Sequence, residues 1–120
     1  MSIDTYKITR HTIQFLTKRV KESAHSMIVL RLYDDDNINR AIVIFEDHAG
    51  AAPPKPTGDH ARQQATAYLD IAHHLAYMDI LRREKTVYLK MGWTQQGRGH
   101  LLSQLSIDTK KEILGEFFTP

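Results

Sequence analysis

The chain has 120 residues, of which 42% are hydrophobic and 25% are charged. These values are typical of a globular protein and exclude a largely disordered chain, so we expect a single domain over residues 1–120. The chain contains no cysteine, which excludes disulfide bonds and thiolate metal sites, and its net charge of +2 at pH 7 does not by itself favour nucleic-acid binding.

We expect a cytoplasmic protein without a membrane partner. The N-terminal residues include Asp4 and form no apolar core region, so they do not resemble a secretory signal peptide. The longest apolar run covers residues 41–45. It is far shorter than the roughly 20 residues that a membrane-spanning helix needs.

Residues 4–22 are predicted to form a helix, because apolar side chains recur there every three or four positions. Two strands follow, over residues 26–33 and 40–46, and the polar turn between them predicts a hairpin. One face of this hairpin is wholly apolar and is predicted to be core: Ile28, Leu30, Leu32, Ala41, Val43 and Phe45. The other face mixes aliphatic with charged side chains: Met27, Val29, Arg31, Tyr33, Arg40, Ile42, Ile44 and Glu46.

Residues 47–58 are rich in alanine, glycine and proline, which predicts a loop. Asp59 is a suitable N-cap for a long helix over residues 59–83, about 38 Å in length. Residues 85–93 alternate as a strand, and residues 100–107 suit either a return strand or a helix. A capping-box spacing predicts a short C-terminal helix over residues 109–118.

The predicted order of elements is therefore α-β-β-α-β-β-α. Two hairpins around one long helix predict an α+β fold. We expect a two-layer sandwich, in which an antiparallel four-stranded sheet packs against the long central helix.

A stripe of chemically active side chains lies within the predicted long helix: Asp70, His73, His74 and Tyr77. An aspartate four residues before a histidine can orient the imidazole or join it on a metal ion, so Asp70 and His74 are the candidate metal ligands. A catalytic zinc site normally has three protein ligands, which this stripe does not clearly supply. We therefore favour the interpretation that the stripe is the polar edge of the helix.

Basic and aromatic side chains form a second candidate site on the predicted sheet. Single-stranded RNA is recognised on open sheets by stacking and phosphate contacts, which require these residue types. The candidate binding residues are Arg31, Tyr33, Arg40, Tyr88, Lys90, Arg98 and His100.

The leading hypothesis is a small non-catalytic binding or adaptor domain that self-associates, as a homodimer. The half-apolar sheet face and the long helix predicted for this chain carry more apolar surface than packing within one domain would bury. Symmetric pairing of two copies is the commonest way to cover such surface. The first alternative is a nucleic-acid-binding regulator that uses the Arg/Tyr sheet face. The second is a small metal-binding protein or enzyme that uses Asp70 and His74. No cofactor is predicted.

Overall fold

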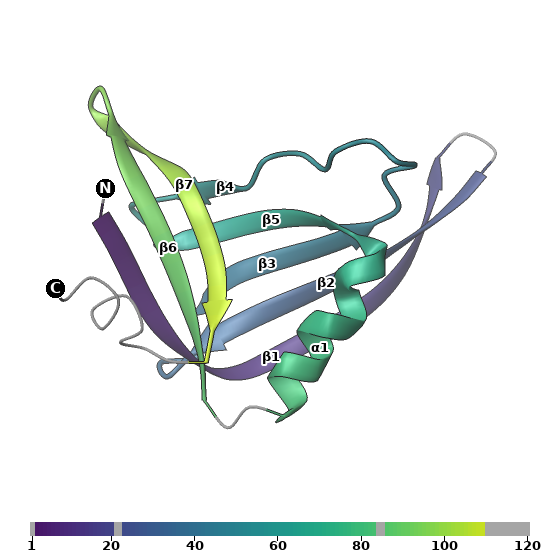
Figure 1. Ribbon diagram of the computed structural model, residues 1–120, viewed down its shortest axis with the longest axis horizontal. Helices are drawn as coiled ribbons and strands as arrows, with labels where there is room; N and C mark the ends of the chain where they lie inside the picture. The colour runs from purple at the N-terminus through teal and green to yellow at the C-terminus, as the bar shows by residue number, and fades with distance from the viewer. Residues whose placement is uncertain (1, 21–22, 84–85, 110–120) are drawn as a thin grey trace, which may run out of the picture.

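The fold is a single curved sheet of seven strands with one short α-helix, as the computed structural model shows over residues 2–20, 23–83 and 86–109 (Figure 1). The sheet is mixed, and its strand order is β4-β5-β3-β2-β1-β6-β7. The predicted α+β sandwich with a four-stranded antiparallel sheet is therefore wrong. The strands are β1 (Ser2–Val20), β2 (Ser23–Asp34), β3 (Asn39–Glu46), β4 (Thr57–Asp59), β5 (Gln64–Asp70), β6 (Val87–Gln96) and β7 (Gly99–Asp108).

The predicted N-terminal helix is instead the long strand β1. This segment is rich in threonine, isoleucine and aromatic residues, which favour strands, and that preference outweighs the helical spacing of its apolar side chains. The strand pairs with β6 from Ser2 to Ile8 and with β2 from Ile8 to Val20. A register shift between Ile8 and Arg10 marks the point where β1 passes from one partner to the other.

The predicted hairpin of β2 and β3 is confirmed, and so is its division into two faces. Ile28 pairs with Phe45 and Leu30 with Val43, and the six side chains predicted to be core are all less than 5% exposed. Val29 pairs with Ile44 on the other face. The strict alternation of apolar side chains fixes this register, because a slip of one residue would place the core side chains in water.

The predicted long helix over residues 59–83 is wrong for most of its length. The chain forms β4, a turn, β5 and the 3₁₀ turn η1 (Ile71–His73) before the helix α1 (His74–Arg83) begins. Strand β5 runs parallel to β3, because the loop over residues 47–56 carries the chain back along the sheet. Helix α1 packs its apolar side on the core, where the Tyr77 ring meets the edge of Phe45.

The last hairpin consists of β6 and β7, so the strand interpretation of residues 100–107 is confirmed. Gly97 lies in the turn with φ of +60°, a conformation that favours glycine. The C-terminal helix predicted over residues 109–118 lies, from residue 110 onward, outside the described residues. No helix in the described ranges is long and apolar enough to cross a membrane.

The two edges of the sheet meet along a line that we call the seam, where β4 and β5 face β7. Figure 1 shows the β6–β7 hairpin folded across from β5 and β3. At the β4 end the edges approach closely, because a Cβ atom placed on Gly58 would lie 2.7 Å from the Trp93 ring and 3.1 Å from Leu102. β4 and β7 are the two outer strands of the sheet, so the near-barrel stays unclosed.

We predict that Gly58→Ala destabilises the fold by about 1–3 kcal/mol, because its methyl group would overlap the buried indole of Trp93. Gly99→Ala is the matched control, since the nearest atom to its Cβ would be 3.8 Å away. Urea unfolding followed by the fluorescence of Trp93, the single tryptophan, measures both changes. Equal stabilities of the two variants would contradict the close approach at the seam.

Candidate functional site

The structure disperses the predicted basic and aromatic binding residues over several surfaces. Arg31 and Tyr33 lie on the outer face of β2, whereas Lys90 is buried on β6 and its Nζ lies 3.3 Å from an Asp108 oxygen. Arg98 is at the tip of the β6–β7 hairpin, and His100 stacks on another histidine. The remaining two residues, Arg40 and Tyr88, line an open groove.

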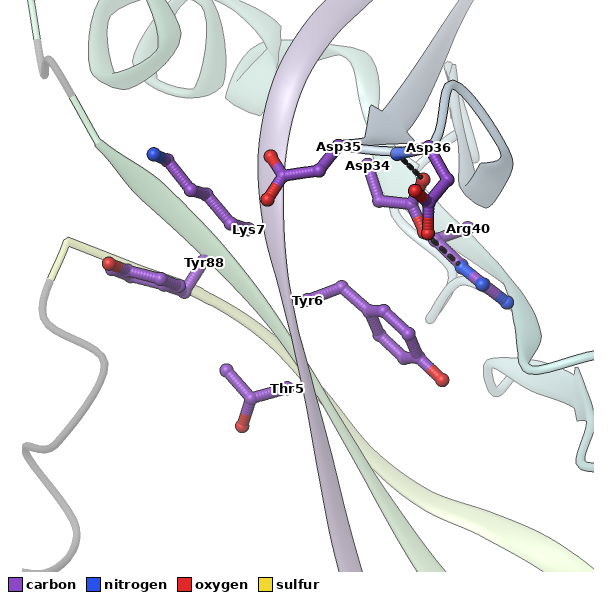
Figure 2. Close-up of a pocket in the computed structure, with 8 residues that line it drawn as sticks. All are labelled: Thr5, Tyr6, Lys7, Asp34, Asp35, Asp36, Arg40 and Tyr88. Atoms are coloured by element: carbon purple, nitrogen blue, oxygen red, sulfur yellow. Dashed lines mark hydrogen bonds and ion pairs between the residues drawn. The ribbon is translucent and has the colours of Figure 1, made fainter.

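This groove has a volume of about 330 Å³ and runs between β1, β6 and the β2–β3 turn (Figure 2). Lys7 and Tyr88 form one wall, while Asp35 and Asp36 stand on the other side. Acidic and basic side chains are thus mixed along its length. Because carboxylates would repel phosphate groups, this mixture does not favour a nucleic-acid backbone in the groove.

The floor of the groove holds a buried ion pair between Asp34 and Arg40. Arg40 Nε donates to Asp34 Oδ2 at 2.7 Å, and the two side chains are only 14% and 7% exposed, respectively. Asp34 Oδ1 also accepts from the backbone N–H groups of Asp36 and Ile38, at 2.9 and 3.0 Å. Burial alone would raise the pKa of Asp34, but these hydrogen bonds outweigh burial and hold its pKa below the usual value.

The same arginine connects three separate parts of the chain. Its guanidinium lies 4.3 Å from the ring centroid of Tyr6 and donates to the backbone oxygens of Arg62 and Gln63. Tyr6 in turn donates to the Gln63 side chain at 2.9 Å. The sequence indicates only a polar turn at Asp34, because its partners lie on strands and turns far away along the chain. This network therefore has a structural role that sequence reasoning missed.

The predicted metal ligands Asp70 and His74 do not share a helical stripe, because β5 ends at Asp70 and α1 starts at His74. Asp70 Oδ2 accepts from the backbone N–H of Ala72 and caps η1. His74 Nδ1 donates to the backbone oxygen of Ile71 at 2.7 Å. Among the described residues, no three metal-ligating side chains gather into one group.

An apolar cavity of about 120 Å³ lies inside the near-barrel, at the part of the seam where β5 and β7 diverge. Val43 and Leu89 come from the core strands, and Tyr77 comes from α1. The seam and the loop before β4 supply the other lining residues: Pro56, Ala67, Tyr68, Leu69, Leu105, Ser106 and Ile107. Sequence reasoning missed this cavity, because five separate elements and a loop contribute to its walls.

Polar groups occur mainly at the rim of the cavity. Strand β4 pairs with β5 only as far as Thr66, so within the described chain the backbone of residues 67–70 has no partner on this side. Ser106 donates to the Asp108 carboxylate at 3.2 Å. Burial raises the pKa of the Tyr77 hydroxyl above its ordinary value, so this group stays protonated, and able to donate, through neutral and moderately alkaline pH.

Comparison with known protein families, with curated proteins and with solved structures finds no match to this chain. A hypothesis about its function must therefore be argued from the chemistry of the cavity and of the surfaces.

We predict that Asp34→Asn lowers the stability of the fold by about 3 kcal/mol, because Arg40 would keep a buried charge without its carboxylate. The neighbouring exposed residue offers the control, Asp35→Asn, which should change stability by less than about 0.5 kcal/mol. Since folding lowers the pKa of Asp34, its contribution is complete above about pH 4 and is lost as the pH falls through the folded value. Unfolding titrations at pH 7 and pH 3 should show the difference between wild type and Asp34→Asn shrinking at the lower pH; an unchanged difference would contradict the ion pair.

Proposed function

We propose that the protein is a small non-catalytic binding protein whose ligand is a one-ring aromatic molecule held in the apolar cavity. The observation that carries this proposal is the apolar space of about 120 Å³ inside an otherwise packed near-barrel. Protein interiors are close-packed, and spaces larger than a water molecule are few in a domain. Such a space with a polar rim is the usual form of a small-molecule site.

The volume limits the size of the ligand. Pockets for drug-sized molecules start at roughly 300 Å³, whereas an apolar cavity of roughly 150 Å³ admits benzene. The cavity lies close to the second value. A single ring with few substituents is therefore the ligand that it fits.

The lining supports binding rather than catalysis. Tyr77 and Ser106 are the lining residues whose side chains carry a hydroxyl, since the Tyr68 side chain belongs to the outer face of β5 beside Ile44. A neutral hydroxyl on Tyr77, together with the backbone groups of β5 that have no strand partner in the described part of the chain, can satisfy one polar substituent of the ligand. We therefore expect phenols and anilines to bind better than hydrocarbons of equal size.

We predict that phenol and aniline bind with dissociation constants of about 1 mM or tighter, as expected for good contacts by so few atoms. Ala67→Leu should abolish binding without unfolding the protein, because the larger side chain fills the cavity. The control is Thr66→Val on the opposite face of β5, which should bind like wild type. Ligand-observed NMR measures all three proteins; no binding by wild type, or full binding by Ala67→Leu, would contradict the proposal.

We propose, as a second candidate, that the protein self-associates through the outer face of the sheet. An apolar group, which we call the outer patch, lies there on β1, β2, β3 and β5: Leu16, Met27, Val29, Ile42, Ile44 and Tyr68. Leu16 is 36% exposed, whereas its neighbours already cover Val29 to 5% exposure. Apolar surface gathered on one sheet face is typical of an interface.

The charges around the outer patch favour a second copy as its occupant. Arg31 lies at one end beside Ile42, and Glu46 lies at the other end beside Asp70. A two-fold axis perpendicular to the strands would place Arg31 of each copy opposite Glu46 of the other. This complementarity supports a symmetric homodimer over a partner of uniform charge.

We predict a solution mass of about twice 13.8 kDa at micromolar concentration, measured by light scattering. Ile44→Lys should give a monomer, because it places two like charges at the centre of the two-fold interface. Ile38→Lys, in the exposed β2–β3 turn, should leave the dimer intact. A monomeric wild type at every concentration would rule out the second candidate.

Nucleic-acid binding is a weaker proposal than either of these. The Arg40 guanidinium is already engaged by Asp34, and Asp35 and Asp36 stand in the groove that Lys7 lines. A cytoplasmic location remains part of the proposal, since a binding protein for small aromatic molecules would meet them there as metabolites.

A further inference from the structure

Two histidine rings stack on each other across the seam. His60 comes from the turn after β4, and His100 comes from the start of β7. Their ring centroids are 3.7 Å apart and their planes differ by 12°. This contact therefore joins the two edges of the sheet at a point where no strand pairing joins them.

The stacked pair lies beside the close approach of Gly58 to Trp93 at the seam. His60 also meets the Trp93 ring at a centroid distance of 5.0 Å and an interplanar angle of 84°. The backbone of Gly58 approaches the same indole. The stack therefore lies directly beside the contact that brings β4 and the β6–β7 hairpin together.

Few charged side chains belong to the elements that meet at this pair. Asp59 and Arg62, on either side of His60, lie 3.7 Å apart as an exposed ion pair. β6 supplies Gln95 opposite His100, and the β6–β7 turn supplies Arg98. β1 contributes Asp4, which pairs with Met91 farther along β6. Within the described chain the surroundings therefore include no acidic group paired with either imidazole.

We propose that His60 and His100 form a proton-sensitive clasp, which holds the seam closed while at least one ring is neutral and releases it when both rings are charged. Imidazole is the side chain that ordinarily changes its charge between pH 5 and 8. Two parallel rings at 3.7 Å can stack when one is neutral, but two positive charges at that distance repel. Acidification therefore weakens the contact between the turn after β4 and the start of β7.

Release of the clasp would also act on the apolar cavity, because that cavity lies farther along the same seam. This consequence, unlike the clasp itself, rests on the proposed function. A looser seam gives ligands an easier path in and out and weakens the walls that β5 and β7 supply. Acidification should therefore speed the exchange of a bound ligand and lower its affinity.

Trp93 fluorescence without any ligand tests the clasp directly, because the chain has one tryptophan and His60 contacts it. We expect the emission to move to longer wavelength between pH 7.5 and pH 5, with the protein still folded by circular dichroism. His100→Phe keeps a ring but cannot take up a proton, so it should lose at least most of this shift. His73→Phe on the exposed η1 turn is the control and should retain it.

A second variant keeps the test decisive if His100→Phe packs poorly. His100→Gln has neither ring nor charge, so the clasp predicts faster amide hydrogen exchange at the start of β7 at pH 7.5 than in wild type, and no further pH-dependent step in Trp93 emission. A wild type without the emission shift, or the same shift in both His100 variants, would overturn the clasp. Phenol affinity measured at both pH values is a separate test. If the Trp93 emission shifts with pH but phenol does not bind, the clasp is supported and the proposed cavity ligand is refuted.

Discussion

The contact between Gly58 and Trp93 is the constraint on which the rest of the fold depends. A seven-stranded sheet must curl until its edges meet if it is to enclose its own apolar face, and only a residue without a side chain allows β4 to lie so close to the indole. The closure is incomplete because β4 has only three residues. The cavity opens where β5 continues beyond the end of β4. The short strand β4 therefore closes one end of the near-barrel and leaves the cavity open at the other end.

Sequence reasoning succeeded where a single pattern determined the structure. The β2–β3 hairpin and its core face follow from strict alternation, as does the strand β6. Residues 100–107 stayed open between a strand and a helix, because the spacing of Leu101, Leu102 and Leu105 suits either element. Sequence reasoning failed for residues 4–22, because apolar side chains at helical spacing occur in a segment whose composition favours strands. It also failed for residues 59–73, because alanine-rich β5 is compatible with a helix and its parallel pairing with β3 leaves no local signal.

The candidate sites differ in predictability for the same reason. The half-apolar outer face could be predicted, because it depends on one hairpin whose register the sequence specifies. The cavity, the Asp34–Arg40 network and the His60–His100 stack each join residues from elements far apart along the chain. Their formation depends on the order of strands in the sheet. The predicted Asp70–His74 stripe disappeared because the helix that would have aligned these residues starts only at His74.

The network around Arg40 determines which side of the seam can move. The turn that carries His60 is held to the rest of the sheet by Arg40, which donates to the backbone oxygens of Arg62 and Gln63, and by the hydrogen bond from Tyr6. His100 belongs to β7, which among the described strands pairs only with β6 and begins next to the exposed hairpin tip at Arg98. Weakening the stack therefore leaves the turn after β4 in place and frees the end of the β6–β7 hairpin. The pKa of Asp34 is lowered, so Asp34 keeps its charge at pH 5 and its ion pair with Arg40 persists there. Arg40 therefore still holds the turn after β4 in place at the pH at which the histidine clasp opens.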